Sequence, residues 1–123
     1  MKLNIDSSSA RYIINAYETG RITVNNQVYS QSLIVTSDQL INQWEPARVE
    51  QIDATHILYL VELNPEIILL GTGKTLQFPH PELISIAMQQ GIGFEVMDTG
   101  SACRTYNILS AEDRNIAAAL IML

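Results

Sequence analysis

Residues 67–74 read Ile-Ile-Leu-Leu-Gly-Thr-Gly-Lys, and this stretch decides the fold that we expect. Its four consecutive apolar residues are typical of a strand buried on both faces, and the glycines after them predict a turn at its end. A helix is predicted next, with a proline at its first position, one apolar face and a glycine stop. These features are Pro81, Ile84, Ala87, Met88 and Gly91. Residues 92–97 predict a second strand, so the unit predicts two parallel strands joined by a crossover helix.

The chain before this unit is predicted to be mostly β structure. Three short strand-like segments, separated by turns, lie at 12–17, 21–24 and 27–29. They predict an antiparallel meander, in which Asn25-Asn26 can supply the positive φ of a tight turn. Residues 32–36 are expected to continue the meander, and residues 38–45 to form a polar connection. A helix then starts at the N-cap Asp53 and ends before Pro65.

The chain after this unit is predicted to leave the sheet as a loop. Small and hydroxylated residues over 97–107 indicate that loop, and Ser110-Ala111-Glu112-Asp113 has the character of a capping box before a helix over 114–120. Residues 121–123 can form one more short strand. We therefore expect an α/β fold: a single compact three-layer domain over residues 1–123, a mixed sheet with a parallel βαβ core, and an N-terminal antiparallel β meander.

Composition and charge exclude several classes of function. The net charge is −6 and the seven Lys and Arg residues are scattered singly, so neither nucleic acid nor an anionic membrane surface is expected as a partner. Apolar runs are too short to span a bilayer, and we expect no membrane insertion. The polar start of the chain lacks a signal peptide and Cys103 is the only cysteine, so we expect a cytoplasmic protein. A hydrophobic content of 47% favours an exposed apolar patch, which leaves a homo-oligomer open.

No complete catalytic or cofactor motif is present. Gly73-Lys74-Thr75 resembles a phosphate loop, but Ile68 stands where the motif needs its first glycine, and Leu76 stands where a dinucleotide motif needs its third. The two histidines and Cys103 lack metal-ligand spacing, and Cys103 is expected to be a buried packing residue. We therefore expect no cofactor, no metal and no enzymatic activity, while an unrecognised enzyme remains the rival hypothesis.

The two predicted loops at 71–75 and 99–107 form the candidate site. Ligands in α/β sheets collect at the carboxyl ends of the strands, where both loops are expected to lie. The candidate ligand-binding or partner-binding residues are Gly71, Thr72, Gly73, Lys74, Thr99, Arg104, Thr105 and Asn107. Arg104 either contacts an anion or a partner's carboxylate, or braces its own loop. Lys74 and Arg104 are expected to face solvent together and to meet an anionic group.

Segments along the whole chain also carry a family resemblance. They are Ile14-Asn15-Ala16-Tyr17, Gly20-Arg21-Ile22-Thr23-Val24, Ser32-Leu33-Ile34-Val35, Gly71-Thr72-Gly73, Pro79, Gly91-Ile92, Glu95-Val96-Met97-Asp98-Thr99, Ala102, Thr105-Tyr106-Asn107-Ile108-Leu109, Glu112, Arg114 and Ala117-Ala118-Ala119-Leu120. In these the chain resembles the small-domain family that contains the mitochondrial complex I assembly factor 3 and the adipogenesis-associated cytosolic protein. It departs from that pattern at Asn26 and Asp113, where glycine is common.

The resemblance implies a three-layer α/β domain without a catalytic motif. For the mitochondrial relative it implies a role in assembling the respiratory NADH:ubiquinone oxidoreductase through protein contacts, and this chain, without a presequence, looks like a bacterial member. The leading hypothesis is thus a non-enzymatic interaction or assembly factor that docks a protein partner at the loop edge. The rival is a small-molecule or anion-binding domain, or an unrecognised enzyme, that uses Thr72, Lys74, Thr99 and Arg104. A closed, dry pocket would favour the ligand, and a flat rim the partner protein.

Overall fold

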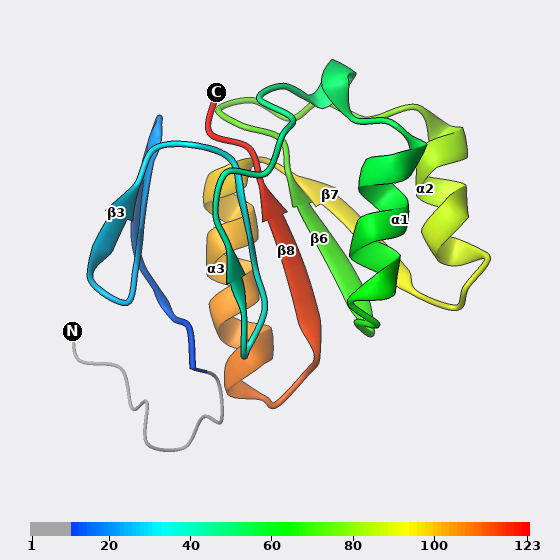
Figure 1. Cartoon of the computed structure of the whole chain (residues 1–123). Helices are drawn as coiled ribbons and strands as arrows, with labels where there is room; N and C mark the ends of the chain where they lie inside the picture. The colour runs from blue at the N-terminus through cyan, green and yellow to red at the C-terminus, as the bar shows by residue number, and fades with distance from the viewer. Residues whose placement is uncertain (1–10) are drawn as a thin grey trace.

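The computed structural model describes residues 11–123, which form two sheets and three α-helices (Figure 1). The smaller sheet is the predicted antiparallel meander of β1 (Ile14–Glu18), β2 (Arg21–Val24) and β3 (Gln27–Tyr29). Its second turn has positive φ at Asn25 (49°) and Asn26 (67°), as predicted, which matches the twist that a two-residue hairpin needs.

The larger sheet has five strands in the order β5-β4-β8-β6-β7. They are β4 (Leu33–Val35), β5 (Leu40–Ile41), β6 (Ile67–Gly71), β7 (Gly93–Met97) and β8 (Ile116–Leu120). β6 is parallel to both β7 and β8, while β4 is antiparallel to β8. The sheet is therefore mixed, and the prediction of two parallel strands joined by a helix is confirmed for β6 and β7.

Three layers result because both faces of β6 are buried. Ile68 and Leu70 pack in an apolar cluster with α1 (Ala54–Glu62) and α2 (Pro81–Met88), while Leu69 packs in a second cluster with α3 (Thr99–Ala111) and the meander. In Figure 1, α1 and α2 lie side by side at one side of the molecule and the meander lies at the other. The α/β class and the three-layer arrangement predicted from the sequence are confirmed.

The two helices on the first face begin and end where the sequence predicted. Asp53 caps α1, because its side chain accepts hydrogen bonds from the backbone N–H groups of Thr55 and His56. Pro81 takes the first helical position of α2, and Gly91 follows that helix with a φ of 78°. The predicted apolar face was wrong at Met88, which is 61% exposed; Leu83 and Ile86 contact the cluster in its place.

The loop predicted over 99–107 is wrong, because these residues belong to α3. Asp98 caps the helix by accepting the backbone N–H of Ser101, and Ala102, Cys103 and Tyr106 form its buried face. Glycine, serine and threonine have weak helix propensity, so this segment looks like a loop when it is read alone. Burial of one face against the sheet overrides that local preference.

The helix predicted over 114–120 is also wrong, because Ile116–Leu120 form the strand β8, and no strand follows at 121–123. All five residues of β8 are buried between β4 and β6. A short, fully apolar run does not distinguish a buried strand from a helix, and three alanines favour the helical interpretation. The supposed capping box at 110–113 is instead the end of α3, where Asp113 has a φ of 61°.

Residues 32–36 do not continue the meander as predicted. β4 crosses to the larger sheet, where it pairs with β8 and with the short strand β5 inside the connection predicted over 38–45. Both faces of β4 are buried, and its unbroken apolar run suits such a position. A meander strand with one solvent-exposed face would alternate apolar and polar residues instead. The two departures from the family pattern, Asn26 and Asp113, are both residues with positive φ, the conformation that explains why glycine is common there.

Candidate functional site

Three parallel strands, β6, β7 and β8, end at one edge of the larger sheet, which we call the carboxyl edge. The segments that follow them are 72–75, the first turn of α3, and 121–123. Thr99 joins all three, because its buried Oγ1 accepts the N–H of Gly73 (2.8 Å) and donates to the carbonyl of Ile121 (2.5 Å). The Thr99 N–H also donates to the Gly73 carbonyl (2.9 Å). The hydroxyl of Thr99 is thus engaged within the protein.

The two glycines of the edge are needed for close packing. Gly73 has a φ of 99°, and a Cβ at that position would overlap the carbonyl oxygen of Leu123. A Cβ on Gly71 would lie 2.9 Å from Thr99 Oγ1 and 3.1 Å from a methyl group of Leu120. Both glycines therefore let the three segments approach one another.

Thr72 shapes the loop that leaves β6. Its hydroxyl donates to the carbonyl of Thr75 (2.7 Å) and accepts the N–H of Gln77 (3.2 Å), while its own N–H donates to the carbonyl of Met97 (2.9 Å). The residue is only 2% exposed. The neighbouring Lys74 is exposed and forms no ion pair with any residue of 11–123.

The candidate residues of α3 do not gather at this edge. Asn107 lies about 12 Å along the helix axis from Thr99, at 1.5 Å per residue. Its side chain accepts the N–H of Ile14 (3.0 Å) and donates to the Ile14 carbonyl (2.7 Å), so it fastens β1 to α3. Thr105 is half-buried. The structure therefore joins Gly71, Thr72, Gly73 and Thr99, and separates them from Thr105 and Asn107.

Arg104 is exposed on α3 and donates to Ser101 Oγ (3.2 Å). Ser101 in turn donates from its N–H and its hydroxyl to the carboxylate of Asp98, each at 2.9 Å. These two hydrogen bonds, with the nearby charge of Arg104, hold the pKa of Asp98 below its ordinary value of 3.8. Lys74 and Arg104 are both exposed, but Arg104 is hydrogen-bonded to its own helix.

Cys103 faces the apolar cluster between the sheet and α3, as predicted for a packing residue. It is 4% exposed, and burial raises the pKa of its thiol to about 12. The histidines are engaged elsewhere: His56 Nε2 lies 2.6 Å from Glu45 Oε1, and His80 accepts the N–H of Glu82 at the start of α2. Within residues 11–123, no three His, Cys, Asp or Glu side chains form a group that could hold a metal ion.

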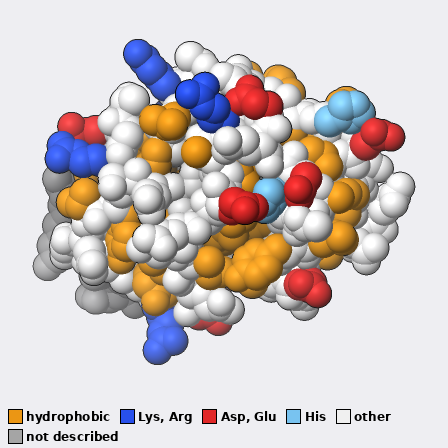
Figure 2. Space-filling model, turned by 45° about the horizontal axis from the view of Figure 1, so that its top comes forward, with side chains coloured by type: hydrophobic (Ala, Val, Ile, Leu, Met, Phe, Trp, Pro, Cys, Tyr) orange, Lys and Arg blue, Asp and Glu red, His pale blue; other side chains and the backbone are white. Residues whose placement is uncertain are grey.

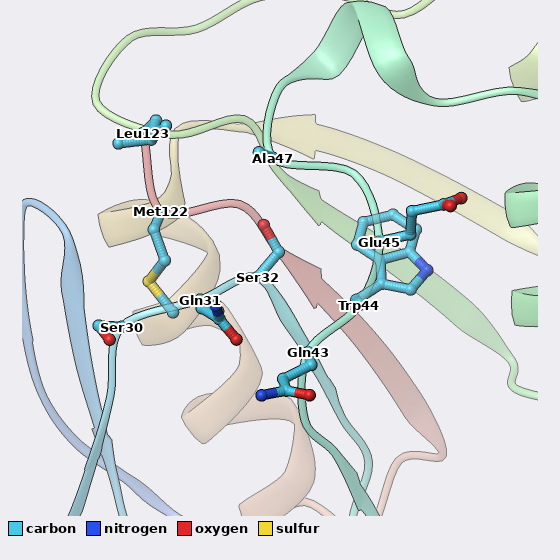
Figure 3. Close-up of a pocket in the computed structure, with 9 residues that line it drawn as sticks. All are labelled: Ser30, Gln31, Ser32, Gln43, Trp44, Glu45, Ala47, Met122 and Leu123. Atoms are coloured by element: carbon cyan, nitrogen blue, oxygen red, sulfur yellow. The ribbon is translucent and has the colours of Figure 1, made fainter.

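Two open hollows flank the last residues of the chain at the carboxyl edge. The larger, about 470 Å³, lies beside Trp44 and Met122 (Figure 3). It is lined by Ser30, Gln31, Ser32, Gln43, Trp44, Glu45, Ala47, Met122 and Leu123. The smaller, about 320 Å³, we call the lysine hollow. It is lined by Arg48, Val49, Glu50, Thr72, Lys74, Thr75, Gln77 and Leu123.

Sequence reasoning missed the contribution of segment 43–50 to this edge. The segment runs into the short 3₁₀ helix η2 (Val49–Gln51). Trp44 lies within the segment, is 7% exposed and packs edge-on against His56, with ring centres 5.9 Å apart. An isolated tryptophan in a polar connection was the available signal. Figure 2 shows this face as an open surface of mixed charged and apolar side chains.

Comparisons with known proteins agree over nearly the whole chain. The family described as "Protein of unknown function (DUF498/DUF598)" matches residues 14–121. The 13 kDa major membrane protein of Francisella tularensis is 30% identical over 122 residues, which cover 98% of this chain and 99% of that protein. The solution structure of a Xanthomonas campestris protein is 36% identical, with a TM-score of 0.84 over 99% of this chain and 92% of that one.

A further relative is NADH dehydrogenase [ubiquinone] 1 alpha subcomplex assembly factor 3 of Danio rerio. It is 34% identical over 117 residues, which cover 93% of this chain. This chain spans only 66% of the length of that relative. Although the Francisella relative is named as a membrane protein, none of the helices within residues 11–123 is long and apolar enough to cross a membrane.

Proposed function

From the premise that this chain belongs to the DUF498/DUF598 family, we propose that it is a non-enzymatic interaction protein, an accessory factor in the assembly of a protein complex. The observation that carries the proposal is the 34% identity with an NADH dehydrogenase assembly factor over 93% of this chain. An assembly factor acts by contacting proteins, so we propose protein partners as well. This chain spans only 66% of the Danio rerio relative, so we propose the class of function, assembly of a protein complex, and leave the identity of the complex to experiment.

The carboxyl edge supports this function because its candidate polar groups are engaged in holding the fold. The hydroxyl groups of Thr72 and Thr99 are both hydrogen-bonded to backbone groups, and Cys103 is buried. The two hollows at this edge have an open rim rather than a closed wall, and Lys74, which lines the smaller one, is exposed. An open rim fits a partner protein better than a small ligand.

A second candidate function is the binding of a small anion at the lysine hollow. Arg48 and Lys74 both line it, and neither forms an ion pair within the described chain. Two cations that converge on one hollow can hold a carboxylate or phosphate group. Compared with the sequence hypothesis, Arg48 takes the place of Arg104 as the partner of Lys74.

Affinity purification from cells of the native organism, followed by mass spectrometry, tests the leading function. We expect the tagged chain to capture a reproducible set of proteins that are subunits or assembly intermediates of one complex. Capture of only its own copies, or of a bound anion without protein, would contradict the proposal. We also propose that the protein is cytoplasmic, which fractionation of the same cells tests. Gel filtration tests whether it forms a homo-oligomer.

A further inference from the structure

The loop between β6 and α2 exposes an unusual run of side chains. Residues 74–78, which we call the docking loop, are all exposed, and two of them are large and apolar. Leu76 is 53% exposed and Phe78 is 68% exposed, the highest fraction among the large apolar residues described. A single exposed apolar side chain is ordinary, but two within three residues of one loop indicate a contact surface.

The docking loop is ordered although its side chains are exposed, because hydrogen bonds and packing hold both of its ends. At its start, Thr72 Oγ1 is hydrogen-bonded to the carbonyl of Thr75 and the N–H of Gln77. Gly73, just before the loop, forms two hydrogen bonds with Thr99. At its end, Pro79 is buried and His80 caps α2. A loop that is already ordered loses little conformational entropy when a partner binds, which favours affinity.

The two sides of the docking loop differ in chemistry. Thr75 and Gln77 line the lysine hollow, and they alternate with Leu76 and Phe78. Lys74 also lines the hollow, whereas Leu76 and Phe78 are not among its lining residues. The loop thus offers polar and cationic side chains to the hollow and exposed apolar side chains outside it.

The charge beside the loop selects the partner's chemistry. Arg21 and Arg114 form ion pairs with Glu18 and Glu66. The other cations within residues 11–123 form none, and two of them, Lys74 and Arg48, line the lysine hollow together. Glu50 lines the same hollow without pairing to either cation. In a chain with a net charge of −6, two free cations at one place favour a partner group that carries negative charge.

We infer that the docking loop binds an acidic segment of a partner protein, whose apolar side chains cover Leu76 and Phe78 and whose carboxylates pair with Lys74 and Arg48. This inference rests on the proposed function and names the surface and the partner's chemistry for it. A lipid surface and a second copy of the chain are the other occupants that such a surface could take, and the experiment below distinguishes both from a partner protein.

Photo-crosslinking in cells of the native organism tests the inference. Phe78→p-benzoylphenylalanine places the probe on the docking loop, and Val28→p-benzoylphenylalanine is the matched control, because Val28 is also apolar and 57% exposed but lies in the meander. We expect adducts with a partner protein from position 78 at least tenfold above those from position 28. Peptide mapping should place the adduct in a segment that combines apolar residues with Asp or Glu.

Charge reversal completes the test. Arg48→Glu combined with Lys74→Glu, in the chain that carries the probe at 78, should lower the adduct yield at least tenfold, while Arg21→Glu should leave it unchanged. Thermal melting and circular dichroism confirm that each variant is folded.

The inference is overturned if the adducts form with lipid or with the chain itself, or if charge reversal leaves the adduct yield unchanged. If wild type captures partner proteins but position 78 gives no adduct, the docking surface is wrong and the proposed function stands; if wild type captures none, the function itself fails.

Discussion

Thr99 joins three strand ends through one buried hydroxyl, which accepts from Gly73 and donates to the carbonyl of Ile121. Thr99→Val keeps the shape of the side chain but leaves both backbone groups without that partner. We expect it to lower the free energy of unfolding by about 2–4 kcal/mol, because unsatisfied buried polar groups are costly. Thr105→Val, at a half-buried position of the same helix, is the control and should cost less than about 0.5 kcal/mol. Urea denaturation measures both, and equal losses would contradict the role of Thr99.

Cys103 is expected to resist alkylation in the native protein. The thiolate is the reactive form, and burial raises the pKa of this thiol to about 12, so almost none is present at neutral pH. Iodoacetamide should therefore modify native Cys103 far more slowly than the same residue in urea-unfolded protein. Mass spectrometry follows the reaction. Rapid modification of the folded protein at neutral pH would overturn this prediction and revive the enzyme hypothesis.

At the scale of the elements, two aspartates start helices and make stability depend on pH. Hydrogen bonds from Thr55 to Asp53, and from Ser101 to Asp98, hold the pKa of each carboxyl below its ordinary value of 3.8. A carboxyl whose pKa is lower in the folded state stabilises the fold fully above about pH 5, and that contribution is lost as the pH falls further. We therefore expect the melting temperature to decline below about pH 5.

Asp98→Asn tests the share of α3 in this decline. Asparagine is also a good N-cap, so the variant should remain folded at pH 7, but its amide does not titrate. We expect a shallower fall in melting temperature between about pH 5 and pH 3 than in wild type. Glu95→Gln, which removes an exposed carboxylate from β7, is the charge-matched control. An unchanged pH profile in Asp98→Asn would show that the cap does not contribute.

The same scale shows how local patterns and tertiary packing compete. α2 carries its own signals, Pro81 at its start and Gly91 after its end, and the sequence predicted it. α3 was missed because Gly100, Ser101 and Thr105 are weak helix formers and its stability comes from the buried face. β8 was missed for the converse reason, since its alanines favour a helix locally but are enclosed by neighbouring strands on both sides.

At the scale of the whole molecule, we propose that the chain is one cooperative domain. The larger sheet separates two apolar clusters, of which one contains Trp44 and the other Cys103. Trp44 is the only tryptophan, so its fluorescence reports on one face of the sheet, and pulsed alkylation of Cys103 reports on the other. Because β6 and β8 contribute to both clusters, we expect the two urea transitions to have the same midpoint. Separate midpoints would show that the faces unfold independently.

The sequence alone was sufficient for the α/β class, the meander and its asparagine turn, the parallel pair β6 and β7, and the glycines of the carboxyl edge. Each of these depends on local signals: apolar period, turn residues, caps and positive φ. Only the tertiary structure decided that α3 is a helix, that β8 lies at the centre of the sheet, and that Arg48 rather than Arg104 shares a hollow with Lys74. The physical reason is that burial and contacts between residues distant in sequence set these features, and no local pattern encodes which segments will meet.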